Sequence, residues 1–237
     1  MNAGPLVDTA TRLIFVEGLP GSGKSTTAGH VVTLLRQAGL AARLIPETQA
    51  GHPLNVGGEL HPAGLTTGQE LFRRYTVEGY VAESLQRWQA FVASVVEIPA
   101  INVLDSYPYQ NAARILLQLD SPTQTIQVYA REVEAVARPL APALIYLKTR
   151  PGAEGLATVS AARGPTWSAY AIEVATNCPY ALNRHLAGFE GALALLNAYD
   201  ALLHTLLSDS SIRRLELEHC SRDWAACYER IATFLGI

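Results

Sequence analysis

The sequence of 237 residues predicts an α/β fold, a three-layer sandwich built around a five-stranded, mainly parallel sheet. Three observations support this prediction. Short β-branched and aromatic runs alternate with segments of helical periodicity, no internal repeat occurs, and no low-complexity linker divides the chain. Strands separated by helices favour parallel pairing, right-handed crossovers and helices on both faces of the sheet. We therefore expect residues 1–237 to form one domain.

Five short runs have the composition expected of strands. Gly18 and Pro46 follow the first two, Pro99 and Pro108 bound the third, and the fifth alternates between polar and apolar residues. The expected strands are residues 12–17, 42–45, 100–105, 143–148 and 213–218.

Helices are expected where apolar residues recur at helical spacing. The first should end before Gly39, a residue suited to the left-handed position after a helix. Gly79 is expected to divide the long periodic segment 67–97 in two. Residues 48–66 and 151–166 have no period and are expected to be irregular. The expected helices are residues 24–38, 67–97, 122–138, 167–176, 188–207 and 224–235.

Charge and cysteine content restrict the partners and the compartment. The formal net charge of −3 gives no electrostatic basis for binding nucleic acid or an anionic membrane. No run reaches the ~18 apolar residues of a membrane span, and the N-terminus lacks a signal-peptide pattern. Cys178, Cys220 and Cys227 form neither a CxxC pair nor a zinc pattern, and we expect buried, reduced thiols. The expectation is a cytoplasmic protein without nucleic-acid or membrane partners.

One motif carries most of the chemical information. Residues 18–25 read GLPGSGKS, which matches the whole phosphate-binding pattern G-x-x-x-x-G-K-[ST] between a strand and a helix. Such a loop points backbone N–H groups at phosphate oxygens, next to the positive end of the helix. Lys24 would contact the β- and γ-phosphates, and the Ser25 hydroxyl is suited to Mg²⁺. The motif is typical of the P-loop NTPase fold and predicts ATP and Mg²⁺ as cofactors. The expected nucleotide-binding residues are Gly18, Pro20, Gly21, Ser22, Gly23, Lys24, Ser25, Thr26 and Arg150.

Two carboxylates follow strands that should end at the same edge of the sheet. Asp105 ends the third strand, where P-loop proteins hold a metal-binding aspartate, and we expect it to bind Mg²⁺ together with Ser25. Glu47 follows the second strand and is placed to accept a proton from an acceptor hydroxyl. The alternatives are an ordinary turn cap for Asp105 and a solvated loop residue for Glu47.

Other polar and aromatic residues are candidates for contacts with substrates. Arg163 is expected to approach the transferred phosphoryl group from a mobile lid. His52 and His61 are weaker candidates, because loop histidines are usually solvated. The same holds for Arg73 and Arg74, which we expect on a solvated helix face. The aromatic residues that could stack on a flat acceptor, or fill the core, are Phe72, Tyr75, Tyr80, Trp88, Tyr107, Tyr109 and Trp167.

The order of these features resembles the thymidylate kinase and deoxynucleoside kinase group. It runs from the phosphate loop through Pro-Glu-Thr, long helices, Leu-Asp-Ser and an arginine-bearing segment to the last strand and helix. The resemblance implies that Glu47 is the base, Asp105 the second carboxylate and Arg163 the lid arginine. It also implies acceptor-side helices over about 48–98 and a helical lid over about 150–170. Ser106 stands where that group carries arginine.

The sequence thus predicts a P-loop kinase, an enzyme that moves the γ-phosphoryl group of ATP to a small-molecule hydroxyl or phosphate. The acceptor stays open between a nucleoside, a nucleotide and another metabolite or antibiotic, and the oligomeric state stays open, a homodimer included. The alternative is a protein that hydrolyses NTP, or binds it as a regulator, without transfer. Two features weigh against this alternative: no Asn-Lys-x-Asp motif occurs, and Ser106 rather than glutamate follows Asp105.

Overall fold

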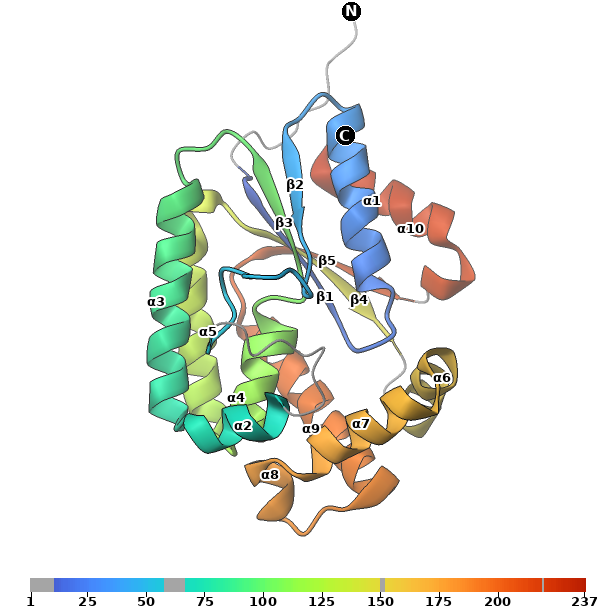
Figure 1. The fold of residues 1–237 in the computed structure, drawn as a ribbon. Coiled ribbons are helices and arrows are strands. Elements are labelled where there is room, and N and C mark those ends of the chain that lie inside the picture. The colour runs from blue at the N-terminus through green and yellow to red at the C-terminus, as the bar shows by residue number, and fades with distance from the viewer. Residues whose placement is uncertain (1–10, 58–66, 150–151, 219) are drawn as a thin grey trace, which may run out of the picture.

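The computed structural model describes residues 11–57, 67–149, 152–218 and 220–237. Its five strands form one sheet in the order β2-β3-β1-β4-β5, and every neighbouring pair is parallel (Figure 1). The predicted α/β class and five-stranded sheet are therefore confirmed. The strands are β1 (Leu13–Gly18), β2 (Ala42–Ile45), β3 (Ile101–Asp105), β4 (Ala143–Lys148) and β5 (Arg213–Glu218).

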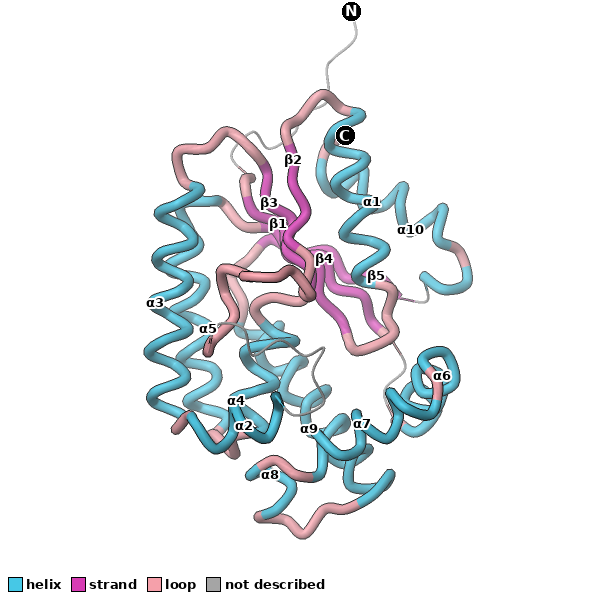
Figure 2. Tube along the Cα trace, in the orientation of Figure 1, coloured by secondary structure: helices cyan, strands magenta, loops and turns pink. Residues whose placement is uncertain are grey.

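Helices cover both faces of the sheet. In Figures 1 and 2, α1 and α10 lie on one face, while α3, α4, α5 and α9 lie on the other. No described helix combines the length and the apolar character needed to cross a bilayer. The α-helices are α1 (Lys24–Gln37), α2 (Thr67–Arg74), α3 (Val77–Val95), α4 (Arg114–Gln118), α5 (Thr123–Ala137), α6 (Ala153–Arg163), α7 (Pro165–Thr176), α8 (Pro179–Leu182), α9 (Gly188–Asp209) and α10 (Trp224–Leu235). A π-helix, η1 (Tyr109–Ala113), precedes α4, and the 3₁₀ turns are η2 (Arg138–Leu140) and η3 (Cys220–Arg222).

Each face of the sheet has its own apolar core. Successive side chains of β1 point to opposite faces, so that Phe15 and Val16 belong to different cores. Phe15 meets Trp88 of α3 edge to face, with ring centroids 5.9 Å apart. On the other face, Val31 of α1 and Ile231 of α10 are fully buried with Val16. These two layers hold the strand ends, and thus the loops that follow them, in fixed positions.

The helical segment 67–97 is divided, but not at Gly79. The break lies at Tyr75 and Thr76, and the Thr76 hydroxyl accepts a hydrogen bond from the Gly79 amide at 3.1 Å. Thr76 is thus the N-cap of α3, and Gly79 lies in the first turn of the helix, where its amide donates to the cap. Gly79 lies close to the boundary between the two helices because its amide donates a hydrogen bond to the N-cap residue, Thr76.

The irregular structure expected for residues 151–166 from their lack of a period is wrong for residues 153–163, which form helix α6. A helix in this stretch agrees with what the resemblance to the kinase group implies. The segment has no apolar period, but it is rich in alanine, which favours a helix intrinsically. α6 packs against α7, and the two helices lie beside each other in Figure 1.

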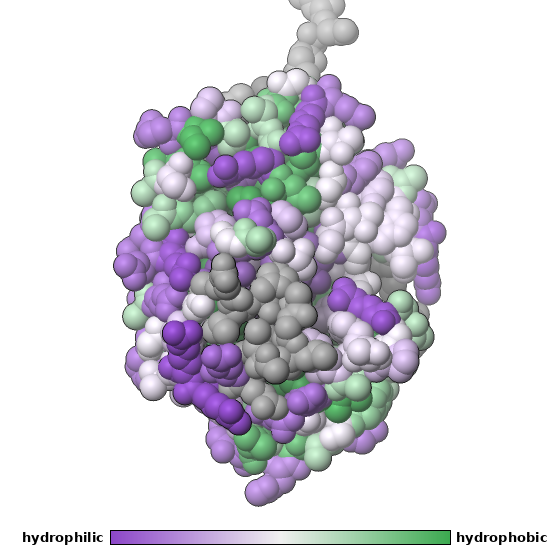
Figure 3. All heavy atoms as spheres, in the orientation of Figure 1, coloured by the Kyte–Doolittle hydropathy of each residue, from purple (hydrophilic) through white to green (hydrophobic). Residues whose placement is uncertain are grey.

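On the face drawn in Figure 3, hydrophilic and hydrophobic residues are interspersed.

The prediction of three reduced thiols is wrong for two of the cysteines. Cys220 and Cys227 form a disulfide, whereas Cys178 is free and buried. The chain turns from η3 into α10 between the two partners, which brings their Cα atoms to 5.7 Å, within the usual range for a disulfide. The expected cytoplasmic location stays a prediction.

Candidate active site

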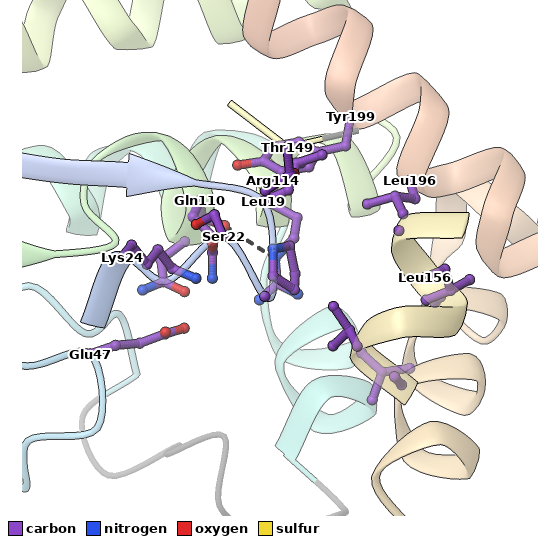
Figure 4. Close-up of a pocket in the computed structure, with 18 of the residues that line it drawn as sticks. Leu19, Ser22, Lys24, Glu47, Gln110, Arg114, Thr149, Leu156, Leu196 and Tyr199 are labelled. Atoms are coloured by element: carbon purple, nitrogen blue, oxygen red, sulfur yellow. Dashed lines mark hydrogen bonds between the residues drawn. The ribbon is translucent and has the colours of Figure 1, made fainter. Parts of the chain in front are cut away.

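A cavity of about 1040 Å³ lies at the carboxyl edge of the sheet. The loop after β1, the chain after β2, and helices α4, α7 and α9 contribute to its walls. In Figure 4, Lys24 and Glu47 lie at one end of this cavity, and Leu156 and Leu196 lie at the other. Parallel α/β sheets bind their ligands at this edge, as the sequence analysis expects.

The glycine-rich loop is closely covered by its neighbours. Gly21 and Gly23 have φ angles of 83° and 87°, a region that favours glycine. A Cβ atom at Gly21 would collide with Val159 of α6, and one at Gly23 would collide with Trp224 of α10. Glycine is therefore required at both positions for conformation and for space.

The polar groups of this loop fit a phosphate. Lys24 and Ser22 are buried, and α1 begins with neither a side-chain cap nor an acidic residue in its first turn. The hydroxyls of Ser22 and Thr27 are also buried and have no hydrogen-bond partner within the described parts of the chain. Open N–H groups at a helix N-terminus, a buried ammonium and an unused hydroxyl form a typical anion site. Gly18 ends β1, Pro20 lies in the loop that follows, and Thr26 is exposed on α1.

Asp105 lies beside the phosphate loop, as predicted. It pairs in register with Val16 of β1, and Ser25 hydrogen-bonds to its carboxylate. The Ser106 hydroxyl donates a second hydrogen bond at 2.9 Å. Burial raises the pKa of Asp105, while Ser25, Ser106 and Lys24 oppose this shift. The two predicted Mg²⁺ ligands are therefore adjacent, and Mg²⁺ is commonly held by one or two protein groups together with phosphates and waters.

Three carboxylates surround the ammonium of Lys24. Burial lowers the pKa of Lys24, and Glu47, Asp105 and Glu17 raise it in that order. Glu47 is half-buried after β2 and lines the cavity together with Lys24 (Figure 4). The predicted base and lysine thus lie at one end of the cavity, and Asp105, which is not one of the lining residues, interacts with both of them.

Glu17 is a buried acid that the sequence analysis does not single out, because it lies inside the apolar run of β1. Its carboxylate accepts hydrogen bonds from the backbone N–H groups of Tyr109, at 2.7 Å, and Gln110, at 3.2 Å. Burial raises the pKa of Glu17 to about 8, against the effects of these N–H groups and Lys24. Glu17 therefore ties the π-helix η1 to the strand that carries the phosphate loop.

We expect Glu17→Gln to weaken the pH dependence of stability. Between pH 4.5 and 8 the unfolded chain has lost this proton and the folded chain keeps it, so the free energy of unfolding falls as pH rises. The variant lacks this contribution, which is on the order of 3 kcal/mol between pH 5.5 and 8.5. Urea unfolding of both proteins at these two pH values measures the difference. Equal pH dependence of the two proteins would contradict the assignment.

A second group of polar residues comes from η1 and α4, elements that the sequence analysis does not predict. Gln110 is buried in the cavity wall, and its Oε1 atom accepts no hydrogen bond from any described residue. Arg114 donates from Nε to the Gln110 carbonyl at 3.1 Å and forms no ion pair with the described residues. A polar residue within an irregular turn leaves no periodic signal. The only sequence signal near η1 and α4 is the prediction that Glu47 and Asp105 lie at this edge of the sheet.

The other predicted polar candidates have different outcomes. Arg163 is exposed at the end of α6, lines the cavity, and lies 5.1 Å from the ring centroid of Trp167. His52 is buried, in contrast to the solvated residue expected, and stacks on Tyr107 at 4.5 Å. Arg150 and His61 lie outside the described residues.

The two predicted helical arginines are exposed, whereas some of the predicted aromatic residues line the cavity and others lie in the core. Arg73 and Arg74 are exposed on α2, consistent with a solvated face. Trp88 packs in the core against Phe91 as well as β1. The predicted aromatic residues that line the cavity are Phe72, Tyr80, Tyr107 and Trp167.

The disulfide fixes the segment that covers the phosphate loop. Cys220, Arg222 and Trp224 line the cavity, and Trp224 lies against Gly23.

We expect the Cys220→Ser, Cys227→Ser double variant to lose about 2 kcal/mol of stability, because the unfolded chain gains freedom when this short loop opens. Thermal unfolding with and without reductant measures this. Reductant should destabilise the wild type and leave the double variant unchanged; a wild type that is insensitive to reductant would contradict the prediction.

Comparison with known protein families and with curated proteins gives no match to this chain.

Proposed function

We propose that this protein is an ATP- and Mg²⁺-dependent phosphotransferase with a P-loop NTPase fold, which transfers the γ-phosphoryl group to a small-molecule acceptor. The main support is the convergence of Lys24, the unused Ser22 hydroxyl and the open N-terminus of α1 beside the Ser25–Asp105 pair. Each of these groups favours phosphate or its metal ion. The resemblance to thymidylate and deoxynucleoside kinases agrees with this proposal.

Each residue has a role that follows from its position. The N–H groups of the loop and Lys24 hold the β- and γ-phosphates, and Ser25 and Asp105 hold the metal ion, which neutralises phosphate charge. Glu47 accepts the proton of the acceptor hydroxyl as that oxygen bonds to phosphorus and the bond to the β-phosphate oxygen breaks. Arg163 stabilises the charge on the transferred group. Arg150 stays a predicted nucleotide contact.

Transfer is favoured over hydrolysis because the cavity extends well beyond the phosphate loop. A water nucleophile needs little space, whereas the cavity of about 1040 Å³ is at the upper end of the usual size of ligand sites. Buried Gln110, with its unused oxygen, lies in the same cavity. This residue supports the proposal of a second substrate in the cavity, because its oxygen could accept a hydrogen bond from it.

ATP consumption measured against panels of nucleosides, nucleotides and hydroxylated metabolites tests the proposal. The expected result is turnover that depends on one class of acceptor and on Mg²⁺, with a phosphorylated product seen by mass spectrometry. Turnover that is equally fast without any acceptor would instead identify an NTP hydrolase. A protein that binds ATP and turns over under no condition would be a nucleotide-binding regulator.

A further inference from the structure

We propose that the acceptor is an amphipathic alcohol whose apolar body lies along α7 and α9. The inference rests on the proposed function, which requires an acceptor hydroxyl at Glu47. It concerns the far end of the cavity in Figure 4, where Leu156 and Leu196 lie away from Lys24. Three observations on that end carry it: its lining, the exposure of α7, and two unused polar atoms between the two ends.

Aliphatic side chains from three helices line this part of the cavity. The described lining residues of α7 and α9 include no charged side chain. The polar groups that these two helices bring to the wall belong to Thr166, Trp167, Tyr170 and Tyr199. Most polar edges of a nucleobase or a sugar ordered there would therefore lie against hydrocarbon, which costs free energy. The aliphatic lining includes Ile115, Ala171, Val174, Ala175, Leu195 and Leu196.

Helix α7 is apolar and yet exposes its apolar face to the cavity. Its twelve residues, all described, include one charged residue, Glu173, and none of the twelve is buried. A helix of this composition normally buries its apolar stripe against a core. α7 packs against α6 and α9, but Trp167, Val174 and Ala175 still line open space. An apolar molecule in the cavity would complete the burial of this face.

Two buried polar atoms define where the head group of the acceptor lies. Oε1 of Gln110 and the hydroxyl of Tyr199 are both buried in the cavity wall without a hydrogen-bond partner in the described chain. Oε1 can only accept a hydrogen bond, so the ligand must donate one. We therefore expect a second hydroxyl near the reacting one, with the apolar body running from this head group toward α7.

The test uses calorimetric titration of the whole protein with Mg²⁺ and a non-hydrolysable ATP analogue, followed by 1,2-alkanediols of six, eight and ten carbons. These probes carry two hydroxyls and an apolar chain. Each buried CH₂ favours binding about fourfold, so Kd should fall roughly fifteenfold for every two carbons added. Thymidine, a compact polar acceptor, serves as the comparison and should bind more weakly than 1,2-decanediol.

Leu196→Gln provides the matched variant, because this half-buried side chain lines the cavity. It should abolish the dependence of Kd on chain length while leaving Kd for the ATP analogue unchanged. Phe189→Gln is the control, since Phe189 is 38% exposed in the first turn of α9 and is not part of the cavity wall. If Leu196→Gln does not fold, Val174→Gln on α7 makes the same test.

The outcomes separate the inference from the proposed function. Binding of the ATP analogue with no chain-length dependence, or with tighter binding of thymidine than of decanediol, overturns the inference alone. Unchanged diol binding by the folded cavity variant overturns it as well. Failure to bind the analogue overturns the proposed function, and with it the role of the cavity as an acceptor site.

Discussion

Lys24→Ala is expected to reduce ATP turnover by at least about 10³-fold, because it removes the charge that faces the β- and γ-phosphates. Glu47 and Asp105 are the two carboxylates that contribute most to the charged form of this lysine, so they would face an uncompensated gap in the variant. Their mutual repulsion would also weaken binding of the nucleotide, which brings more negative charge. We therefore expect both kcat and the affinity for ATP to fall.

The test needs a folded variant and a charge-matched control. Lys24→Met keeps most of the buried hydrocarbon length, and circular dichroism checks that the helices persist. Arg131→Ala removes a positive charge from an exposed pair with Asp209, at 3.9 Å on a remote surface, and should behave as wild type. Steady-state assays of ATP consumption compare the wild type with Lys24→Ala, Lys24→Met and Arg131→Ala. Turnover at the wild-type rate in Lys24→Met would contradict the proposal that this loop and Lys24 bind the phosphates of ATP.

The features that the sequence predicts well are those encoded by neighbouring residues. The phosphate loop is one continuous motif, and its lysine is one of only two in the chain, at positions 24 and 148, which makes the match specific. β4 and β5 have the predicted bounds because continuous apolar and alternating runs are strong local signals. Asp105 and Glu47 could be placed at one edge because parallel strands end together.

The features that the sequence does not predict depend on contacts between distant segments. Glu17 looks like part of an apolar strand, and only folding brings it to the N–H groups of Tyr109 and Gln110. The Cys220–Cys227 disulfide depends on the angle at which η3 enters α10. His52 is a loop residue, yet its stacking on Tyr107 buries it. In each case tertiary packing overrides the local pattern.

Glu47→Gln is expected to slow phosphoryl transfer by roughly 10²–10⁴-fold while ATP still binds. The amide keeps the size of the side chain but cannot accept the proton of the acceptor hydroxyl. Single-turnover transfer measured beside equilibrium binding of ATP separates the two effects. Glu132→Gln, which neutralises an exposed acid on α5, should match the wild type. An unchanged transfer rate in the Glu47 variant would assign the proton to another group.

Glu47 also acts on Lys24, so a slow variant does not by itself identify a base. Among the carboxylates around Lys24, Glu47 makes the largest contribution to raising its pKa, and the amide removes that contribution. Glu47→Asp distinguishes the two roles, because it keeps a negative charge near Lys24 but withdraws the carboxylate by one methylene. If Glu47 is the base, transfer should be slow in both variants, since proton transfer needs hydrogen-bond contact with the acceptor hydroxyl. If Glu47 only supports the charge of Lys24, transfer should be slow in Glu47→Gln and close to the wild-type rate in Glu47→Asp.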